Sequence, residues 1–469
     1  MKVRTLAGCA FAIAALYACG GGGGGGSGTS NPPSVTPAKV GLPTLITSSV
    51  IADVNADGLT DLVIGGVDLA GDANAFGGSD LLLLNRGGDT FERVKLPAHY
   101  LGTGGGTIIL KAADLNGDGY QDLMTVTVSN DYTTSRVQLY MNDGKGGYMD
   151  ASSQIEANTY NGWFSHLDLV DVDGDGKLDA VLSTWSGAQG VVIYRGDGKG
   201  QFTRPVITFS RSANPMTDPA AWTHLGKLAE KVDVGSFAFR PAFRGDFNGD
   251  GSQDFFDSKT NAMFFNRSSP GNFAFTVAPS NVTYTSTGIS GLSFIDGVAV
   301  DVNADGKPDL VVSASNARSL QLPSVPVLVL YNNGDGTFTE RSVTAFGSVA
   351  KVPQVRHARQ FLVADLDADG SPEILIADHG YDDGTFPGAP NVLLSIKSGT
   401  IANVSERLGS TQNGYTHGAA IGDLNGDGKP DLFLNNAIPN GVTTTSDPEP
   451  RFWLKQGDGT FKPWTVTIR

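Results

Sequence analysis

A short acidic motif occurs seven times along this chain and constrains its fold more than any other feature. Each copy reads Asp-x-(Asn/Asp)-x-Asp-Gly-x-x-(Asp/Glu) and is followed by an apolar run. Oxygen-bearing side chains therefore alternate around a glycine, which tolerates the positive φ of a sharp turn. A loop of this kind can supply the roughly six to eight oxygen ligands that Ca²⁺ prefers. The motif therefore predicts seven calcium loops.

The predicted ligands are the side chains at loop positions 1, 3, 5 and 9 and the backbone carbonyl at position 7. Glu373 is the one ninth-position residue that is not aspartate, and we expect weaker or adjusted binding in its loop. Loop by loop, the predicted ligands are Asp53, Asn55, Asp57, Leu59 and Asp61; Asp114, Asn116, Asp118, Tyr120 and Asp122; Asp171, Asp173, Asp175, Lys177 and Asp179; Asp246, Asn248, Asp250, Ser252 and Asp254; Asp301, Asn303, Asp305, Lys307 and Asp309; Asp365, Asp367, Asp369, Ser371 and Glu373; and Asp423, Asn425, Asp427, Lys429 and Asp431.

The EF-hand is the main alternative, because its loop opens in the same way. An EF-hand also needs a bidentate glutamate at position 12 and a helix on each side. Strand-like apolar runs follow these loops instead, which favours loops that join strand to strand. Ordinary Asp/Asn/Gly turns without metal are the other alternative. Position 12 holds Ile64, Thr125, Leu182, Asp257, Val312, Ile376 and Leu434, so six of the seven copies have no carboxylate there.

The charge balance agrees with metal binding. The loops contain 23 of the 48 acidic residues, and seven Ca²⁺ ions would add 14 positive charges to the formal charge of −15, leaving −1. Without metal, clustered carboxylates repel one another and destabilise a compact state. The acidic balance argues against a nucleic-acid partner, because such binding depends on Lys and Arg contacts to phosphate.

The repeat also predicts the fold. The first aspartates recur every 55 to 75 residues, and a second pattern of apolar run, Gly-rich turn and aromatic residue trails most loops. That second pattern is typical of a β-hairpin, so each repeat holds four short strands. Four-stranded units repeated four to eight times describe a β-propeller. The sequence therefore predicts an all-β, seven-bladed propeller with one calcium loop in each blade.

With these flanks the loops resemble FG-GAP/VCBS repeats of the integrin α-subunit type; the segment 419–432 is an example. The resemblance covers about residues 40–469. It implies a seven-bladed propeller with calcium bound between the first two strands of each blade. The Phe-Gly and Gly-Ala-Pro signatures are largely missing, which favours a bacterial VCBS-type protein over an integrin-like adhesion head.

The N-terminus is typical of an exported protein. Lys2 and Arg4 precede a 13-residue apolar stretch that is too short to span a membrane, as in a secretory signal. Residues 1–19 resemble a bacterial lipoprotein signal peptide in which Cys19 is the lipidated residue. Residues 20–39 are Gly/Ser/Pro-rich and predict a flexible tether. We therefore expect a lipid-anchored propeller over residues 40–469, in the bacterial outer membrane or at the cell surface, and a monomer.

Two further regions could meet a partner. The segment 203–245 is the longest insertion, and Asp218 and Pro219 are suited to start a short helix there. It either covers a blade edge or offers a binding surface. Three histidines precede their loops by five to eight residues, which places them on the innermost strands. A polar, aromatic ring at one face is one interpretation and solvated strand residues are the other; the candidate members are His166, His357, His417, Trp163, Tyr415 and Arg356.

Common catalytic motifs are missing, and carboxylates held ionised by metal are poor general acids or bases. The leading hypothesis is therefore a non-enzymatic, calcium-stabilised propeller that binds a protein or glycan partner on one face. A carbohydrate-binding lectin and a polysaccharide lyase-like enzyme are the alternatives.

Overall fold

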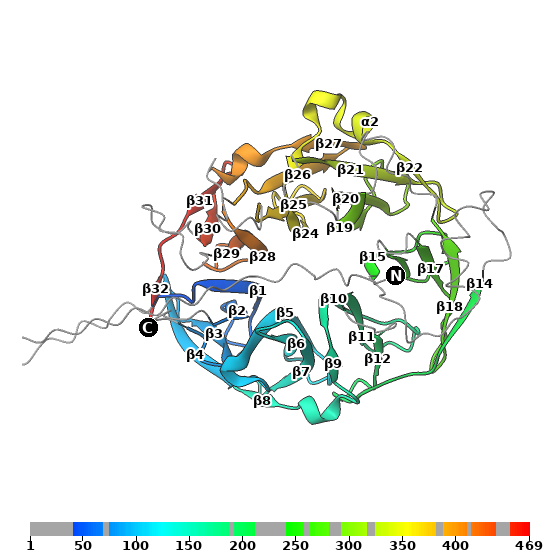
Figure 1. Ribbon diagram of the computed structural model, residues 1–469. Coiled ribbons are helices and arrows are strands. Elements are labelled where there is room, and N and C mark those ends of the chain that lie inside the picture. The colour runs from blue at the N-terminus through cyan, green and yellow to red at the C-terminus, as the bar shows by residue number, and fades with distance from the viewer. Residues whose placement is uncertain are drawn as a thin grey trace, which may run out of the picture.

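The computed structural model describes residues 41–68, 75–186, 192–211, 241–257, 262–280, 292–316, 324–380, 388–409, 414–437 and 451–469. Over these residues the strands form seven separate sheets arranged around a common centre (Figure 1). Each sheet contains four consecutive antiparallel strands, and some carry an additional short strand at the edge. The predicted all-β, seven-bladed propeller is confirmed.

The first of the four consecutive strands of each blade lies innermost, and the next three follow it outwards (Figure 1). The strands of the first four blades are, in blade 1, β1 (Leu45–Ala52), β2 (Asp61–Val67), β3 (Ser79–Asn85) and β4 (Thr90–Ala98); in blade 2, β5 (Gly105–Ala113), β6 (Asp122–Ser129), β7 (Thr134–Asn142), β8 (Tyr148–Asp150) and β9 (Thr159–Asn161); in blade 3, β10 (Trp163–Val170), β11 (Asp179–Ser186), β12 (Val192–Gly196) and β13 (Phe202–Thr203); and in blade 4, β14 (Ile207–Arg211), β15 (Pro241–Gly245), β16 (Asp254–Asp257), β17 (Ala262–Asn266) and β18 (Phe273–Pro279). In blade 4 the innermost strand is β15, and β14 is an additional strand at the outer edge.

Blades 5 to 7 follow the same plan, with a few short helical turns between strands. Their strands are, in blade 5, β19 (Leu292–Val300), β20 (Asp309–Asn316), β21 (Val325–Asn332), β22 (Phe338–Glu340) and β23 (Gln354–Val355); in blade 6, β24 (Ala358–Ala364), β25 (Glu373–Asp378), β26 (Val392–Lys397) and β27 (Thr400–Asn403); and in blade 7, β28 (Thr416–Gly422), β29 (Asp431–Asn436), β30 (Phe452–Lys455) and β31 (Phe461–Pro463), followed by β32 (Thr467–Ile468). The helical turns of the whole described chain are the helix α2 (Ser342–Phe346) and the 3₁₀ helices η1 (Gly102–Gly104), η2 (Ser152–Gln154), η5 (Val349–Lys351) and η6 (Ser405–Leu408).

The core lies between neighbouring blades. The apolar run after each acidic loop forms the second strand, and β2 is buried along its whole length. Side chains on opposite faces of that strand serve two different interfaces: Val63 packs with Leu123 of blade 2, and Leu62 packs with Phe433 of blade 7. Because a strand sends alternate side chains to opposite faces, a blade that is buried on both sides needs a continuous apolar run.

The ring closes where its two ends meet at blade 1. After β31 the chain crosses to the outer edge of this blade, where β32 pairs in parallel with β4. The Arg93 N–H also donates a hydrogen bond to the Arg469 carbonyl, 2.9 Å away. The same arrangement occurs inside the ring, where β14 follows blade 3 and pairs in parallel with β18 of blade 4. Closure therefore repeats, at the end of the chain, a crossing that is also used between two internal blades.

A β-bulge interrupts every innermost strand. The register with the second strand shifts in all seven blades. In blades 6 and 7 the residues within the shift are Arg359 and the pair His417 and Gly418. A bulge bends the strand and re-aims a side chain, and bulges are common next to functional sites. The bulges give the propeller a recurring position, near its centre, at which side chains can vary without disturbing the blades.

Several sequence-based predictions concern residues outside the described part of the chain. These are the signal peptide (1–19), the tether (20–39) and the helix expected to start at Asp218. Within the described residues, no helix has the length and apolar character needed to cross a membrane.

Replacing Ile468 tests the closure. This side chain is 7% exposed and packs in one cluster with Phe91 and Phe452, where blade 7 meets blade 1. We expect Ile468→Ala to lower the free energy of unfolding by about 2–4 kcal/mol, as for other large-to-small changes in a core. Urea unfolding in excess calcium would measure the loss. Val206→Ala, at a position that is 86% exposed, is the matched control and should change stability little; equal losses in the two variants would contradict this account of closure.

Candidate functional site

The seven acidic loops lie at one end of the ring, because each follows the end of an innermost strand and leads into the second strand. Within a loop the first aspartate organises the turn. In blade 1, Asp53 accepts hydrogen bonds from the N–H groups of Asp57 (3.2 Å) and Gly58 (2.9 Å). Gly58 has φ +85°, as expected of the sixth position. The fourth position, Ala56, is also left-handed at φ 56°. This second left-handed position was not recognised in the sequence, although glycine occupies it in four of the seven loops.

The ninth-position carboxylate connects the loop to the third strand of its own blade. Asp61 accepts one hydrogen bond from Val54 N (3.0 Å) in the loop and another from Asn85 N (2.8 Å) at the end of β3. Five other aspartates make the same pair of contacts. In blade 6, Glu373 accepts from Leu366 N (2.8 Å) and from the Ser395 hydroxyl (2.9 Å). The longer glutamate therefore keeps the same connection by using a different donor.

Burial affects the charge of these carboxylates. It raises the pKa of Asp61, Asp309 and Asp431 to about 6 and that of Asp179 and Asp254 to about 7, although the two backbone hydrogen bonds oppose the shift. A carboxylate oxygen has more than one lone pair, so accepting a backbone hydrogen bond leaves capacity for a further contact. A nearby cation would favour the ionised form.

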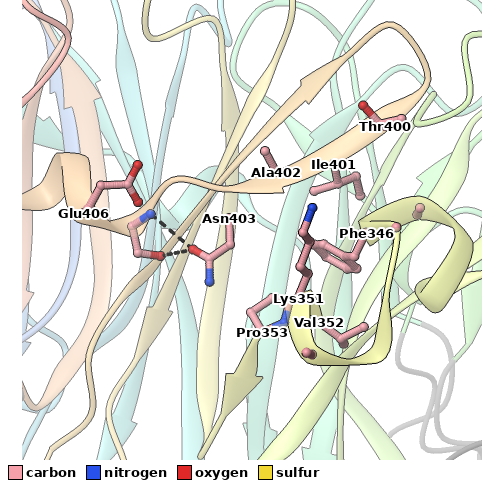
Figure 2. A pocket seen from close by; sticks show the side chains of 13 residues that line it. Phe346, Lys351, Val352, Pro353, Thr400, Ile401, Ala402, Asn403 and Glu406 are labelled. Atoms are coloured by element: carbon pink, nitrogen blue, oxygen red, sulfur yellow. Dashed lines mark hydrogen bonds between the residues drawn. The ribbon is translucent and has the colours of Figure 1, made fainter.

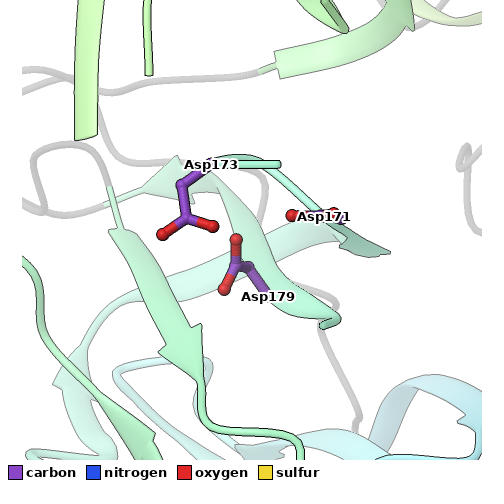
Figure 3. A group of neighbouring side chains, drawn as sticks. All are labelled: Asp171, Asp173 and Asp179. Atoms are coloured by element: carbon purple, nitrogen blue, oxygen red, sulfur yellow. The ribbon is translucent and has the colours of Figure 1, made fainter. Parts of the chain in front are cut away.

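Two of the loops have the donor geometry of a metal site. Asp171, Asp173 and Asp179 each bring an oxygen within 4.8 Å of the others, and Asp365, Asp367 and Asp369 do the same. Figure 3 shows the carboxylates of Asp173 and Asp179 turned towards one another. These are the two loops with aspartate rather than asparagine at position 3. Because all the donors are oxygens, either cluster could hold a hard cation such as Ca²⁺.

Lysine and arginine side chains contact the carboxylates of several loops. Lys397 lies 2.5 Å from Asp369, and Lys429 lies 2.8 Å from Asp427. These hydrogen bonds lower the pKa of both aspartates. Arg195 likewise contacts Asp173 and Asp175. The basic side chains supply some of the positive charge that the acidic loops require.

A second connection joins several of the loops to the next blade. The Asn142 side chain donates to the carbonyl of Val54, 2.9 Å away in the loop of the preceding blade, and Asn266 does the same to Val172 at 2.8 Å. In blade 7, Lys455 takes this place and donates to the Leu366 carbonyl at 2.7 Å. The loops are thus part of the interfaces between blades.

A cluster of aromatic and basic side chains lies at the opposite end of the strands, on blades 6 and 7. His379 is 1% exposed and stacks on Tyr415 with ring centroids 4.6 Å apart. The rings of His357 and His417 lie edge-on to His379 at 4.4 Å and 5.2 Å. Arg356 borders the cluster and donates to the Gly388 carbonyl. Sequence reasoning had placed four of these residues together but had missed His379, which follows the second strand and not the first.

The imidazoles in this cluster are neutral at pH 7. Burial lowers the pKa of His357 and His417 to about 3 and that of His379 well below its usual value, and the nearby charge of Arg359 adds to each shift. His357 and His417 keep part of their surface exposed, so water softens the effect for those two. Three imidazoles can bind a metal, but among the described residues only the two carboxylate clusters bring three ligand atoms within 4.8 Å.

Two members of the predicted ring lie elsewhere. His166 Nε2 is 3.1 Å from Asp296 Oδ1, so it joins blade 3 to blade 5 beside the short strand β15 of blade 4. Trp163 packs edge-on against Tyr132 of blade 2, with ring centroids 5.8 Å apart. Both residues take part in packing between blades and not in the cluster on blades 6 and 7.

Asp80, His99 and Thr107 form a buried group between blades 1 and 2 that superficially resembles a catalytic triad. His99 Nε2 lies 3.0 Å from Asp80 and 3.2 Å from the Thr107 hydroxyl. In a catalytic triad the carboxylate and the nucleophile contact opposite ring nitrogens. Here both contact the same nitrogen, and all three side chains are buried, so the group stabilises the interface between the blades.

An open pocket of about 700 Å³ lies away from both sites, between α2–η5 and β27. Figure 2 shows Lys351 and Glu406 on its wall, and Asn403 engaged by two hydrogen bonds from Ser405. The remaining lining is mainly small and apolar. Polar groups do not converge there as they do at the cluster on blades 6 and 7.

Three regions of the chain, residues 53–125, 301–376 and 365–434, match the FG-GAP-like repeat family. No curated protein sequence matches the chain. Among solved structures, a mutant Aleuria aurantia lectin in complex with α-methyl-L-fucoside is 11% identical with a TM-score of 0.32, and covers 77% of this chain and 96% of its own. A GH43_1 enzyme from Xanthomonas citri is 10% identical (TM-score 0.29, 92% of this chain and 93% of that one). The exotype rhamnogalacturonan lyase YesX is 15% identical (TM-score 0.29, 92% and 68%). Likeness at these TM-scores carries no argument about function.

Substitutions in one loop separate its metal-binding and structural roles. In a chelator, Asp61→Asn should lower the free energy of unfolding by about 1–3 kcal/mol, because an amide cannot accept both buried backbone hydrogen bonds. The exposed change Asp57→Asn should alter stability little in chelator but should reduce the stabilisation that calcium adds. Thermal unfolding at pH 7.5, with calcium and with chelator, would measure both. A wild-type midpoint that is the same in the two conditions would show that the loops are turns only.

The Asp80–His99 contact predicts a specific pH dependence. Burial disfavours the charged imidazole, but the ion pair with Asp80 outweighs it and raises the pKa of His99 above its usual 6.5. A raised folded-state pKa stabilises the protein fully below pH 6.5, and this stabilisation is lost as the pH rises through the folded-state pKa. The stability difference between wild type and His99→Gln should therefore be largest below pH 6.5 and shrink towards pH 9. A difference that grows with pH would contradict the assignment.

Proposed function

We propose that this propeller of FG-GAP-like repeats is a calcium-stabilised, exported binding protein that recognises a protein or glycan partner on one face. The observation that carries this proposal is the division of polar groups between the two ends of the strands. Acidic loops occupy one end in every blade, whereas the His/Tyr/Arg cluster occurs at the other end on blades 6 and 7. A repeated feature is suited to stabilise the ring, and a feature unique to two blades is suited to recognise a ligand.

Calcium would be held by the side-chain oxygens at loop positions 1, 3, 5 and 9 and by the carbonyl at position 7. The ion would supply positive charge to carboxylates that otherwise repel one another, and so would favour the folded state over the unfolded state. In loops such as that of blade 6, Lys397 would have to share Asp369 with the ion or move away from it. The described chain has oxygen donors at these positions in all seven blades.

Export and anchoring form part of the proposal. The basic start, the short apolar stretch and Cys19 support a lipoprotein signal and a lipid anchor in the bacterial envelope. A Gly/Ser/Pro-rich tether after Cys19 would hold the propeller away from the membrane surface. Apart from the lipidated Cys19, the proposed mature chain has no cysteine and so no disulfide. Bound calcium would serve the stabilising role that disulfides often have in exported proteins. We expect a monomer.

A lectin is one form of this binding function, and a polysaccharide lyase-like enzyme is the second candidate. One observation favours the second: His357 and His417 are partly exposed, so a substrate could reach them. Their pKa of about 3 makes them weak proton acceptors at neutral pH, so this candidate ranks below binding. A lyase would form unsaturated sugar ends from acidic polysaccharides, which absorb in the ultraviolet. Loss of that absorbance change in His357→Ala or His417→Ala would support an enzyme, and no absorbance change in the wild type would exclude a lyase acting on the polysaccharides tested.

Binding can be tested with the calcium-loaded protein on an array of glycans and of extracellular proteins. We expect saturable binding to at least one class, and weaker binding after chelation, because the loops hold the blades in register. Binding should also be impaired by a change in the cluster on blades 6 and 7, such as His417→Asn, and should not be impaired by Val206→Ala on the exposed surface. Absence of saturable binding to either class would contradict the proposal.

A further inference from the structure

Arg359 is a cation beside the cluster on blades 6 and 7. It is the bulged residue of β24, and its side chain is only partly exposed. Its guanidinium makes no hydrogen bond or ion pair with the described residues. Partial burial removes some of the water that would stabilise this charge, so an anion at this position would be favourable.

Two buried carboxylates on blades 6 and 5, those of Asp378 and Asp296, are engaged by other groups. Asp378 accepts hydrogen bonds from the backbone N–H groups of Arg356 (2.6 Å), His357 (2.8 Å) and Gly380 (3.0 Å). On blade 5, Asp296 accepts from His166 and from its neighbour's backbone N–H. Neither carboxylate neutralises the guanidinium. Among the described residues the positive charge of Arg359 is therefore uncompensated, in a chain whose net charge is strongly negative.

The side chains of His417 and Gln360, beside Arg359, are uncharged and lie at fixed positions in the two bulges. His417 occupies the bulge of the adjacent innermost strand, and its Nδ1 is buried without a hydrogen-bond partner among the described residues. Gln360, the residue after the bulge, accepts a hydrogen bond from Ala419 N at 2.8 Å and so fixes the two bulges relative to one another. Arg359 lies on β24 two residues after His357, next to the strand that carries His417, and its charge lowers the pKa of all three imidazoles of the cluster.

We propose that Arg359, with His417, binds the carboxylate of an acidic sugar. The proposal rests on the binding function proposed above and specifies the chemistry of its ligand. Of the two guanidinium groups at the cluster, that of Arg356 is engaged by the Gly388 carbonyl, which leaves that of Arg359 for a ligand. One available guanidinium suits a group with one negative charge, because a phosphate dianion would need a second cation. Guanidinium and carboxylate match as a pair of parallel hydrogen bonds, and a sugar also brings hydroxyl groups that could contact the partly exposed His417.

Titration calorimetry on the calcium-loaded full chain tests the assignment. The ligands are oligogalacturonate and glucuronate-containing oligosaccharides, their methyl esters, and inorganic sulfate and phosphate. We expect saturable binding of at least one acidic oligosaccharide, with Arg359→Gln weakening it about ten- to a hundredfold. The affinity of Arg359→Lys should lie between those of wild type and Arg359→Gln, because lysine keeps the charge but loses the paired geometry. The methyl ester should bind as weakly to wild type as the acid binds to Arg359→Gln.

Arg86→Gln is the matched control, because it removes a guanidinium that pairs with Glu92 on the exposed edge of blade 1 and should leave affinity unchanged. Circular dichroism and thermal midpoints confirm that each variant folds. Equal affinity for acid and ester, or equal effects of the Arg359 and Arg86 changes, would overturn the assignment. Binding of sulfate or phosphate as tight as that of the sugar would also overturn it. If only neutral glycans or proteins bind, the carboxylate site is wrong while the binding function stands; if nothing binds, both fail.

Discussion

The carboxylate at the ninth position of each acidic loop is the interaction on which the rest of the propeller depends. It is buried, and it accepts one hydrogen bond from the loop and one from the third strand, as Asp61 does with Val54 and Asn85. One side chain therefore fixes the loop to the blade that it enters. Burying a carboxylate is costly unless it is hydrogen-bonded, and these contacts provide that compensation. The blade-6 variant, Glu373, keeps the same role through the Ser395 hydroxyl, so the connection is retained while its chemistry varies.

The same loops connect neighbouring blades, so a metal ion bound in one loop would affect the whole ring. Asn142 and Lys455 donate hydrogen bonds to loop carbonyls of the preceding blades, so a change in loop geometry would alter the packing between two blades. Lysine and arginine side chains already contact several of the loop carboxylates. Loop charge and blade packing are therefore coupled, and the affinity of the proposed calcium sites would depend on both. A loop that holds an ion would stabilise both the blade to which it belongs and the contact with the next blade.

Ligand recognition and ring stability can be separated because they use different ends of the strands. The bulge recurs in every innermost strand, so its backbone geometry belongs to the fold, whereas its side chain differs from blade to blade. Arg359 and His417 occupy this position on adjacent blades, near the stacked rings of His379 and Tyr415. The apolar second strands carry the packing, so such variation at the bulge is compatible with a stable ring. The proposed sugar-binding role is confined to this variable position.

The sequence by itself determined the number of blades, their four-strand order and the position of each acidic loop. All of these depend on local patterns: ligand spacing, apolar runs and turn residues within one repeat. The tertiary structure decided which distant residues meet. The closure by β32 on β4, the contact of His166 with Asp296, and the addition of His379 to the cluster all join residues far apart in the chain or in different blades. No local pattern records such pairings, because they depend on how the blades twist and pack around the ring. The same reason explains why four cluster members could be named from their place before a loop. That no described residue pairs with the guanidinium of Arg359 could be recognised only once its surroundings were known.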